Sequence, residues 1–138
     1  MTAAGYSGTP LSKKLGLKAG SRVLLVGAPG GYADLLQPLP PDVSFVAQAG
    51  PGIDIAQVFV IDRDDLAMQL RRLREALPPA AALWISWPKQ ASKVPTTVTE
   101  DTIRELALPL GWVDVKVCAI SEVWSGLKLV VRKALRPS

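Results

Sequence analysis

The sequence contains no histidine and a single cysteine among its 138 residues. Without histidine, the chain has no imidazole for general acid–base catalysis and lacks the usual base that activates a serine or cysteine nucleophile. The common imidazole metal sites are excluded as well, so the sequence predicts no metal site and no catalytic residue. One cysteine, Cys118, excludes an internal disulfide and is typical of a reducing compartment, so we expect a cytoplasmic protein.

Long hydrophobic runs are also missing. No apolar run reaches the ~18 residues of a membrane-spanning helix, and residues 1–20 lack the apolar stretch and cleavage site of a secretory signal. The sequence therefore predicts no membrane contact. Hydrophobic residues make up 49% and charged residues 20% of the chain, which is typical of a globular domain. We expect one domain over residues 1–138, with a flexible segment at 1–9 and a tail at 134–138.

A strong charge of either sign is absent, because the net charge is only +4. Basic residues nevertheless gather in two groups near the ends of the sequence: Lys13, Lys14, Lys18 and Arg22, then Lys128, Arg132, Lys133 and Arg136. Solubility explains such groups, and nucleic-acid binding is the alternative. Because they are not interleaved with aromatic residues as in single-strand binders, we do not expect a nucleic-acid partner.

What the sequence does have is a regular alternation of apolar strands and amphipathic helices. It predicts six strands, over residues 22–26, 43–47, 55–61, 82–87, 113–120 and 127–132. Helices are predicted over 10–15 and 32–36, after an N-cap at Asp62, and after a capping box that pairs Thr97 with Glu100. This order predicts an α/β fold with a mostly parallel sheet. The short loop at 121–126 predicts that the last two strands form an antiparallel hairpin.

The first predicted strand runs directly into a glycine-rich turn at residues 27–31 (GAPGG). A strand that leads through glycines into a helix is typical of the phosphate-side turn of a nucleotide-binding α/β domain. The whole succession resembles a class I methyltransferase domain, a Rossmann-like fold that also ends in an antiparallel hairpin. The resemblance covers about residues 15–133 and rests on three phrases, at residues 17–27 (LKAGSRVLLVG), 77–85 (LPPAAALWI) and 110–117 (LGWVDVKV). It implies a shortened, three-layer methyltransferase-like domain with a mostly parallel six-stranded sheet.

The chain is more closely similar to a family of small bacterial proteins of unknown function. This resemblance covers nearly the whole chain. It rests on residues 6–16 (YSGTPLSKKLG), 87–89 (WPK) with 94–96 (VPT), 115–119 (VKVCA) and 123–128 (VWSGLK). It implies no activity.

Several parts of a methyltransferase cofactor site are missing from the sequence. The acid that such enzymes carry two places before the first glycine is Leu25 here, and the ribose-binding carboxylate after the second strand is replaced by Ala47 and Gln48. Pro29 has no N–H to donate in the glycine turn, and the strand–helix unit that normally supplies adenine contacts is absent. Each lost charged hydrogen bond weakens binding roughly ten- to a hundredfold. The sequence therefore predicts no cofactor, S-adenosylmethionine included.

Ligands of open parallel sheets bind beyond the carboxyl ends of the strands. At that edge we expect backbone, one acid, two indoles and two lysines: Gly27, Gly30, Gly31, Asp62, Trp87, Lys89, Lys93 and Trp124. We hypothesise a shallow pocket for an anionic or planar ligand, with charge from the lysines and stacking surface from the tryptophans. Each member also has a purely structural explanation, such as a tight turn, a covered sheet edge or a helix cap. Residues 6–9 either fold over this edge as a lid or are a frayed end.

Three functions from different classes fit these observations. The favoured one is a non-catalytic Rossmann-like module that binds a small ligand or a protein partner. The alternative is an enzyme, either a reduced methyltransferase or another group transferase that uses Lys89, Asp62 or Glu122. A second alternative is a nucleic-acid-associated protein that uses its basic ends. The sequence leaves the oligomeric state open.

Overall fold

The computed structural model describes residues 9–136. The predicted flexible segment at 1–9, with the lid considered at 6–9, lies outside the described residues except for Thr9. The predicted tail at 134–138 is described up to residue 136, and its beginning belongs to the 3-10 helix η3 (Lys133–Leu135).

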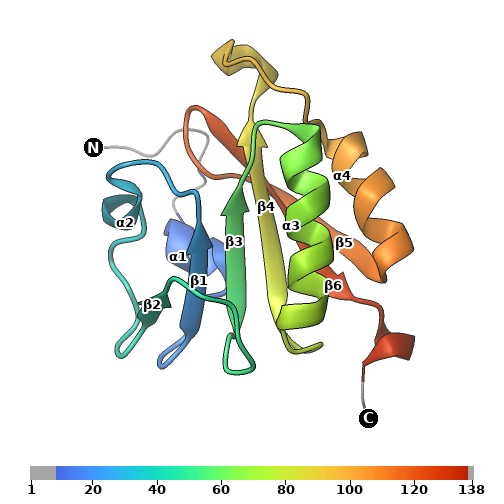
Figure 1. The fold of residues 1–138 in the computed structure, drawn as a ribbon. Coiled ribbons are helices and arrows are strands. Elements are labelled where there is room, and N and C mark those ends of the chain that lie inside the picture. Colours follow the sequence, from blue (N-terminus) through green and yellow to red (C-terminus); the bar gives the residue numbers. More distant parts are fainter. Residues whose placement is uncertain (1–8, 137–138) are drawn as a thin grey trace.

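Six strands form one sheet in the order β2-β1-β3-β4-β6-β5 (Figure 1). The parallel strands are β1 (Arg22–Val26), β2 (Ser44–Val46), β3 (Ile55–Phe59) and β4 (Ala82–Pro88). The antiparallel partner of both β4 and β5 (Trp112–Ala119) is β6 (Trp124–Val131). The predicted mostly parallel six-stranded sheet with a closing hairpin is therefore confirmed.

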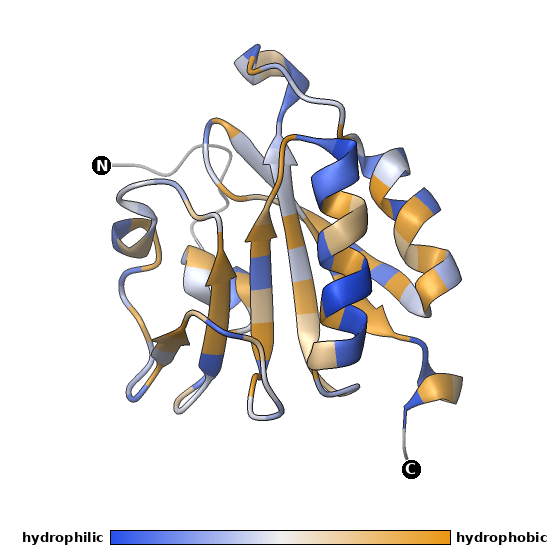
Figure 2. Cartoon of the chain, viewed as in Figure 1, coloured by the Kyte–Doolittle hydropathy of each residue, from blue (hydrophilic) through white to orange (hydrophobic). Residues whose placement is uncertain are grey.

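Helices cover both faces of the sheet, which gives three layers (Figure 1). One face packs against α3 (Arg63–Ala76) and α4 (Glu100–Ala107), and the other against α1 (Leu11–Leu15) and the short α2 (Tyr32–Leu35). Two further 3-10 helices, η1 (Gln90–Ser92) and η2 (Leu108–Leu110), follow β4 and α4. Figure 2 shows the strands as largely apolar, while α3 and α4 alternate apolar and polar stripes. Within residues 9–136, no helix combines the length and the apolar character that crossing a membrane requires.

The larger core lies between the sheet and α3. Leu66, Leu70 and Leu73 recur at helical spacing and have no exposed surface, because their stripe faces β3 and β4. Burying one such leucine stabilises the fold by about 1.5–3 kcal/mol. The helix begins where predicted, since Oδ2 of Asp62 accepts hydrogen bonds from the backbone N–H groups of Asp64 and Asp65 at 3.0 and 3.2 Å.

The start of α4 differs from the prediction. Thr99, not Thr97, is the N-cap, and it forms a reciprocal capping box with Thr102. The hydroxyl of Thr97 is engaged elsewhere, because its oxygen accepts a 2.7 Å hydrogen bond from the backbone N–H of Arg63. That bond ties the segment after β4 to the first turn of α3.

The opposite face is covered mainly by short segments around Trp84. This indole has no exposed surface, and its Nε1–H donates a 3.1 Å hydrogen bond to the carbonyl of Leu15 at the end of α1. Leu11 and Leu15 pack into the same cluster. A five-residue helix is marginal on its own, so its place depends on this packing.

Candidate functional site

The carboxyl ends of the parallel strands lie at one edge of the sheet, together with the β5–β6 turn (Figure 1, top). Pro88 at the end of β4 pairs with Trp124 at the start of β6. The backbone N–H of Lys89 donates a 2.7 Å hydrogen bond to the carbonyl of Val123 in the hairpin turn. The structure thus brings the glycine turn, Asp62, Lys89 and the hairpin to the same edge.

The glycines of the turn have two different roles. Gly27 has a φ of +71°, and a Cβ added there would lie 3.0 Å from the carbonyl oxygen of Phe59, so this glycine lets β1 end close against β3. Among the described residues 9–136, no heavy atom lies within 4 Å of a Cβ added at Gly30 or Gly31. This second half of the turn is open, and a ligand can approach its backbone closely.

A buried polar network lies beneath the turn. The Tyr32 hydroxyl donates a 2.6 Å hydrogen bond to Oε1 of Gln57, whose Nε2 donates a 3.0 Å bond to Oγ of Ser86. Burial raises the pKa of Tyr32 well above its ordinary value. Sequence reasoning missed this network, although the signal was present: Gln57 is the one polar residue of β3.

An aromatic row continues from this network across the sheet. The ring of Phe59 packs edge to face against Tyr32, with centroids 4.9 Å apart, and against Trp124, with centroids 5.1 Å apart. Trp124 is only half-buried. The row therefore leaves one partly exposed indole beside the hairpin turn.

The two candidate tryptophans do not come together. Trp87 is only 8% exposed and belongs to the core on the α3 and α4 face, whereas Trp124 packs on the opposite face against Phe59. Successive residues of a strand point to opposite faces, and Trp124 pairs with Pro88 rather than with Trp87. The structure thus offers a single indole with accessible surface at this edge.

The two candidate lysines are accessible to different degrees. Lys89 is half-buried, while Lys93 is exposed and follows η1 with a φ of +62°. Within residues 9–136, neither takes part in an ion pair. Asp62 is exposed as well, but its Oδ2 atom is already used to cap α3. In the same range, no cluster of acidic or cysteine side chains has the arrangement of a metal site.

A cavity of about 430 Å³ lies at the other end of the strands. Its walls come from the turn between α1 and β1, the start of β3 and the segment before β4. This cavity is separate from the carboxyl ends of the strands, and none of the candidate residues lines it.

Comparison with known proteins supports the fold. No protein-family model matches the sequence, and no curated protein matches it. A possible exported protein from Bordetella parapertussis has a TM-score of 0.64 at 14% identity, over 93% of this chain and 66% of that protein. A SAM-dependent methyltransferase from Aquifex aeolicus has a TM-score of 0.60 at 15% identity, over 87% of both chains. The N-methyltransferase NodS from Bradyrhizobium japonicum WM9 also has a TM-score of 0.60, at 14% identity, over 89% of this chain and 91% of that one.

The fold is therefore a shortened, Rossmann-like class I methyltransferase fold. The resemblance to a small bacterial family of unknown function stays a prediction, because no family model supports it. The comparisons contradict the prediction that no cofactor is involved. It relied on missing acids and glycine spacing, whereas the similar solved structures include an S-adenosylmethionine-dependent enzyme.

Proposed function

We propose that this chain is a reduced methyltransferase-type domain that binds S-adenosylmethionine at the carboxyl edge of its sheet. One observation carries the proposal. An open glycine turn lies at the carboxyl edge of a sheet that superposes with a SAM-dependent methyltransferase over 87% of both chains. This favours the enzyme alternative over the module without a cofactor.

The described residues fit the cofactor in part. The backbone at Gly30 and Gly31 is open, which permits the close approach of a cofactor to a glycine turn. Beyond β2, the exposed Gln48 stands where a ribose-binding carboxylate is usual. Its amide offers neutral hydrogen bonds to the ribose hydroxyls, so we expect binding weaker than with a carboxylate by roughly ten- to a hundredfold.

The remaining side chains of this edge suggest the class of methyl acceptor. S-adenosylmethionine supplies an activated methyl group, and the protein must hold the acceptor in line with it. Lys89 carries positive charge beside the hairpin, Lys93 adds a second charge after η1, and Trp124 offers a partly exposed ring. This set favours an anionic or planar acceptor.

The first test is a ¹⁵N-HSQC titration with S-adenosylmethionine, S-adenosylhomocysteine, ATP and NAD. We expect shifts at Gly30, Gly31 and Gln48 with the first two ligands only. No shift at millimolar S-adenosylmethionine, or equal shifts with all four ligands, contradicts the proposal.

A pair of variants ties the shifts to the glycine turn. Gly30→Val fills open space in front of the turn and should abolish the S-adenosylmethionine shifts while the protein stays folded. Ala134→Val also creates a branched side chain, by adding two methyl groups at an exposed position of η3, and should leave them unchanged. Binding without formation of S-adenosylhomocysteine in the presence of acceptors would favour a binding module over an enzyme.

A further inference from the structure

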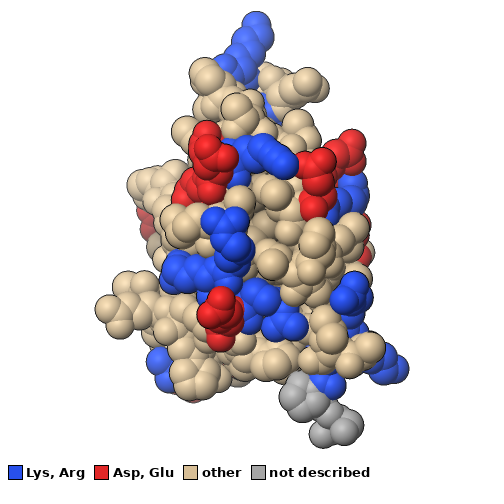
Figure 3. Space-filling view, turned by 45° about the vertical axis from the view of Figure 1, so that its right-hand side comes forward, with Lys and Arg blue, Asp and Glu red and all other residues tan. Residues whose placement is uncertain are grey.

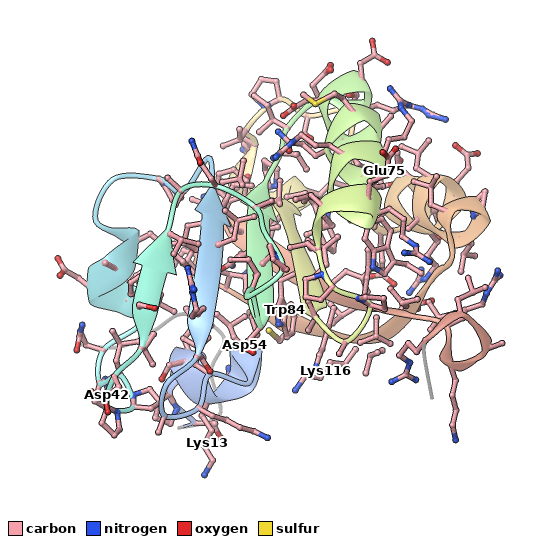
Figure 4. All side chains as sticks on the ribbon, turned by 60° about the horizontal axis from the view of Figure 1, so that its bottom comes forward. Lys13, Asp42, Asp54, Glu75, Trp84 and Lys116 are labelled. Carbon is pink, nitrogen blue, oxygen red and sulfur yellow. The ribbon has the colours of Figure 1, made fainter. Side chains whose placement is uncertain are left out.

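Two lysines occupy one row of the sheet on the face that α1 covers. Lys116 of β5 pairs directly with Lys128 of β6, and Lys128 pairs in turn with Trp84 of β4. The Nζ atom of Lys116 lies 5.9 Å from the centroid of the Trp84 ring. Figure 4 shows Trp84 and Lys116 near Asp54, the residue that precedes β3. Like charges that face each other across two strands destabilise a sheet.

The lysine row reaches the 430 Å³ cavity through Lys128. Lys128 and Lys18 both line this cavity, and Lys18 lies in the turn between α1 and β1. A volume in the range of about 300–1,000 Å³ is typical of small-molecule sites. Two basic groups that are far apart in the sequence are thereby joined in the fold.

The described residues balance these cations only in part, through the one carboxylate that lines the same cavity. Within residues 9–136, Lys18, Lys116 and Lys128 form no ion pair. Asp54 also lines the cavity, but its Oδ2 atom accepts a 2.9 Å hydrogen bond from the backbone N–H of Arg22. Burial lowers the pKa of Lys128, and the charges of Lys116 and Lys18 lower it further.

Packing explains one of the lysines but not the other. The ammonium group of Lys116 lies over the ring of Trp84, which is a favourable use of an edge-strand lysine. Lys128 has no such role, since it is half-buried between another lysine and a cavity. A like-charged pair that no described ion pair balances is expected at a functional site.

We infer that this cavity is an anion site, in which Lys18 and Lys128 bind the phosphoryl group of a small molecule. Ser21 adds a polar contact: its buried hydroxyl accepts a 2.9 Å hydrogen bond from the backbone N–H of Lys18, and its own hydrogen remains available to donate. Two ammonium groups and one carboxylate line the cavity, and Lys116 adds a third positive charge beside Lys128. This balance suits a multiply charged anion better than a single carboxylate. The site lies at the opposite edge from the proposed S-adenosylmethionine site and does not depend on it.

Calorimetric titration with inorganic pyrophosphate at low salt tests the inference. Lys128→Gln should weaken binding about ten- to a hundredfold, because it removes one charged contact. Lys13→Gln is the matched control. It removes the same charge from an exposed position of α1 that does not line the cavity, so it should change the affinity by no more than about twofold. Stronger binding of ADP than of pyrophosphate would identify a nucleotide as the source of the phosphoryl group.

A second measurement needs no variant. In the wild-type protein, pyrophosphate should raise the pKa of Lys128 toward its ordinary value, which a ¹³C-detected titration of the lysine Cε signals reads directly. The inference is overturned if pyrophosphate fails to bind at millimolar concentration, or if Lys13→Gln and Lys128→Gln weaken it equally. Binding of a short single-stranded oligonucleotide without binding of pyrophosphate also overturns it. Lys128→Gln should leave the S-adenosylmethionine shifts unchanged, which keeps the two proposals separate.

Discussion

Tyr32 and Gln57 join α2 to the middle of the sheet through a 2.6 Å hydrogen bond that has almost no contact with solvent. The amide of Gln57 passes the connection on to Ser86 of β4, which has no exposed surface. Since α2 has only four residues, it cannot hold its place by its own hydrogen bonds. The buried bond therefore positions the glycine turn that precedes α2.

Tyr32→Phe should destabilise the fold by about 1–3 kcal/mol, because Oε1 of Gln57 is left buried without a donor. Urea unfolding of the wild type and the variant measures the difference. In a Gln57→Leu background the acceptor is absent, so Tyr32→Phe should cost clearly less. An equal cost in both backgrounds would mean that the ring packing of Tyr32 matters and the hydrogen bond does not.

Gly27→Ala and Gly30→Ala should differ although both lie in one turn. At Gly27 the positive φ and the 3.0 Å approach to the carbonyl of Phe59 predict a loss of about 1–3 kcal/mol. At Gly30 there is open space, and the free energy of unfolding should change by less than about 0.5 kcal/mol. Thermal unfolding of the two variants decides between these roles, and equal losses would contradict the distinction.

The strands were predictable because buried strands consist mostly of apolar residues, which the sequence shows directly. The central β3 is apolar except for Gln57, and all its residues are buried. The start of β6 was placed too late, at residue 127 instead of Trp124, because Gly126 resembles a turn residue. In the fold, Gly126 belongs to β6 and pairs with Ser86 of β4. The position needs a glycine because an added Cβ would come within 2.8 Å of Ile120 and 3.2 Å of Trp84.

The candidate site was harder to predict because it depends on register. The sequence places Trp87 and Trp124 at one edge, but the pairing of β4 with β6 sets them on opposite faces. The lysine row illustrates the same limit. Lys18 and Lys128 are 110 positions apart in the sequence, and only the order of the strands brings them to one cavity.

Arg104 joins α4 to the edge strand β5, and protonation of Asp114 at low pH should weaken this contact. Its Nε donates a 3.0 Å hydrogen bond to Oδ2 of Asp114 on β5, and its other nitrogens contact Glu100 and Asp101. Figure 3 shows acidic and basic side chains side by side on one face of the molecule. The hydrogen bond from Arg104 lowers the pKa of Asp114 below its ordinary value.

Asp114→Asn should therefore change the acid limb of the stability profile. A carboxyl group with a lowered pKa stabilises the fold above its ordinary pKa, and this contribution disappears as the pH falls through the lowered value. At neutral pH the variant should lose at most about 1 kcal/mol, because the pair is partly solvated. Urea unfolding between about pH 6 and pH 2 measures both effects. Asp34→Asn, at an exposed position of α2, is the control, and an identical pH profile for the two variants would contradict the assignment.

The like-charged pair Lys116 and Lys128 should limit stability when no anion is bound. Lys128→Met removes one charge and should raise the free energy of unfolding at about pH 7 by up to about 1 kcal/mol. The pKa of Lys128 is lowered in the fold, so the native state releases this proton at a lower pH than the unfolded chain. Wild-type stability should therefore rise as the pH climbs from that lowered pKa toward the ordinary value of lysine, and the advantage of Lys128→Met should shrink over the same interval.

Urea unfolding at about pH 7 and about pH 10 tests this sign, with Lys13→Met as the control for the loss of one exposed charge. Added salt should reduce the advantage of Lys128→Met at the lower pH, because it screens the repulsion. A variant that is less stable than the wild type at both pH values would mean that Lys128 already has a partner within the chain. The charge of Lys128 would then need no bound anion to balance it.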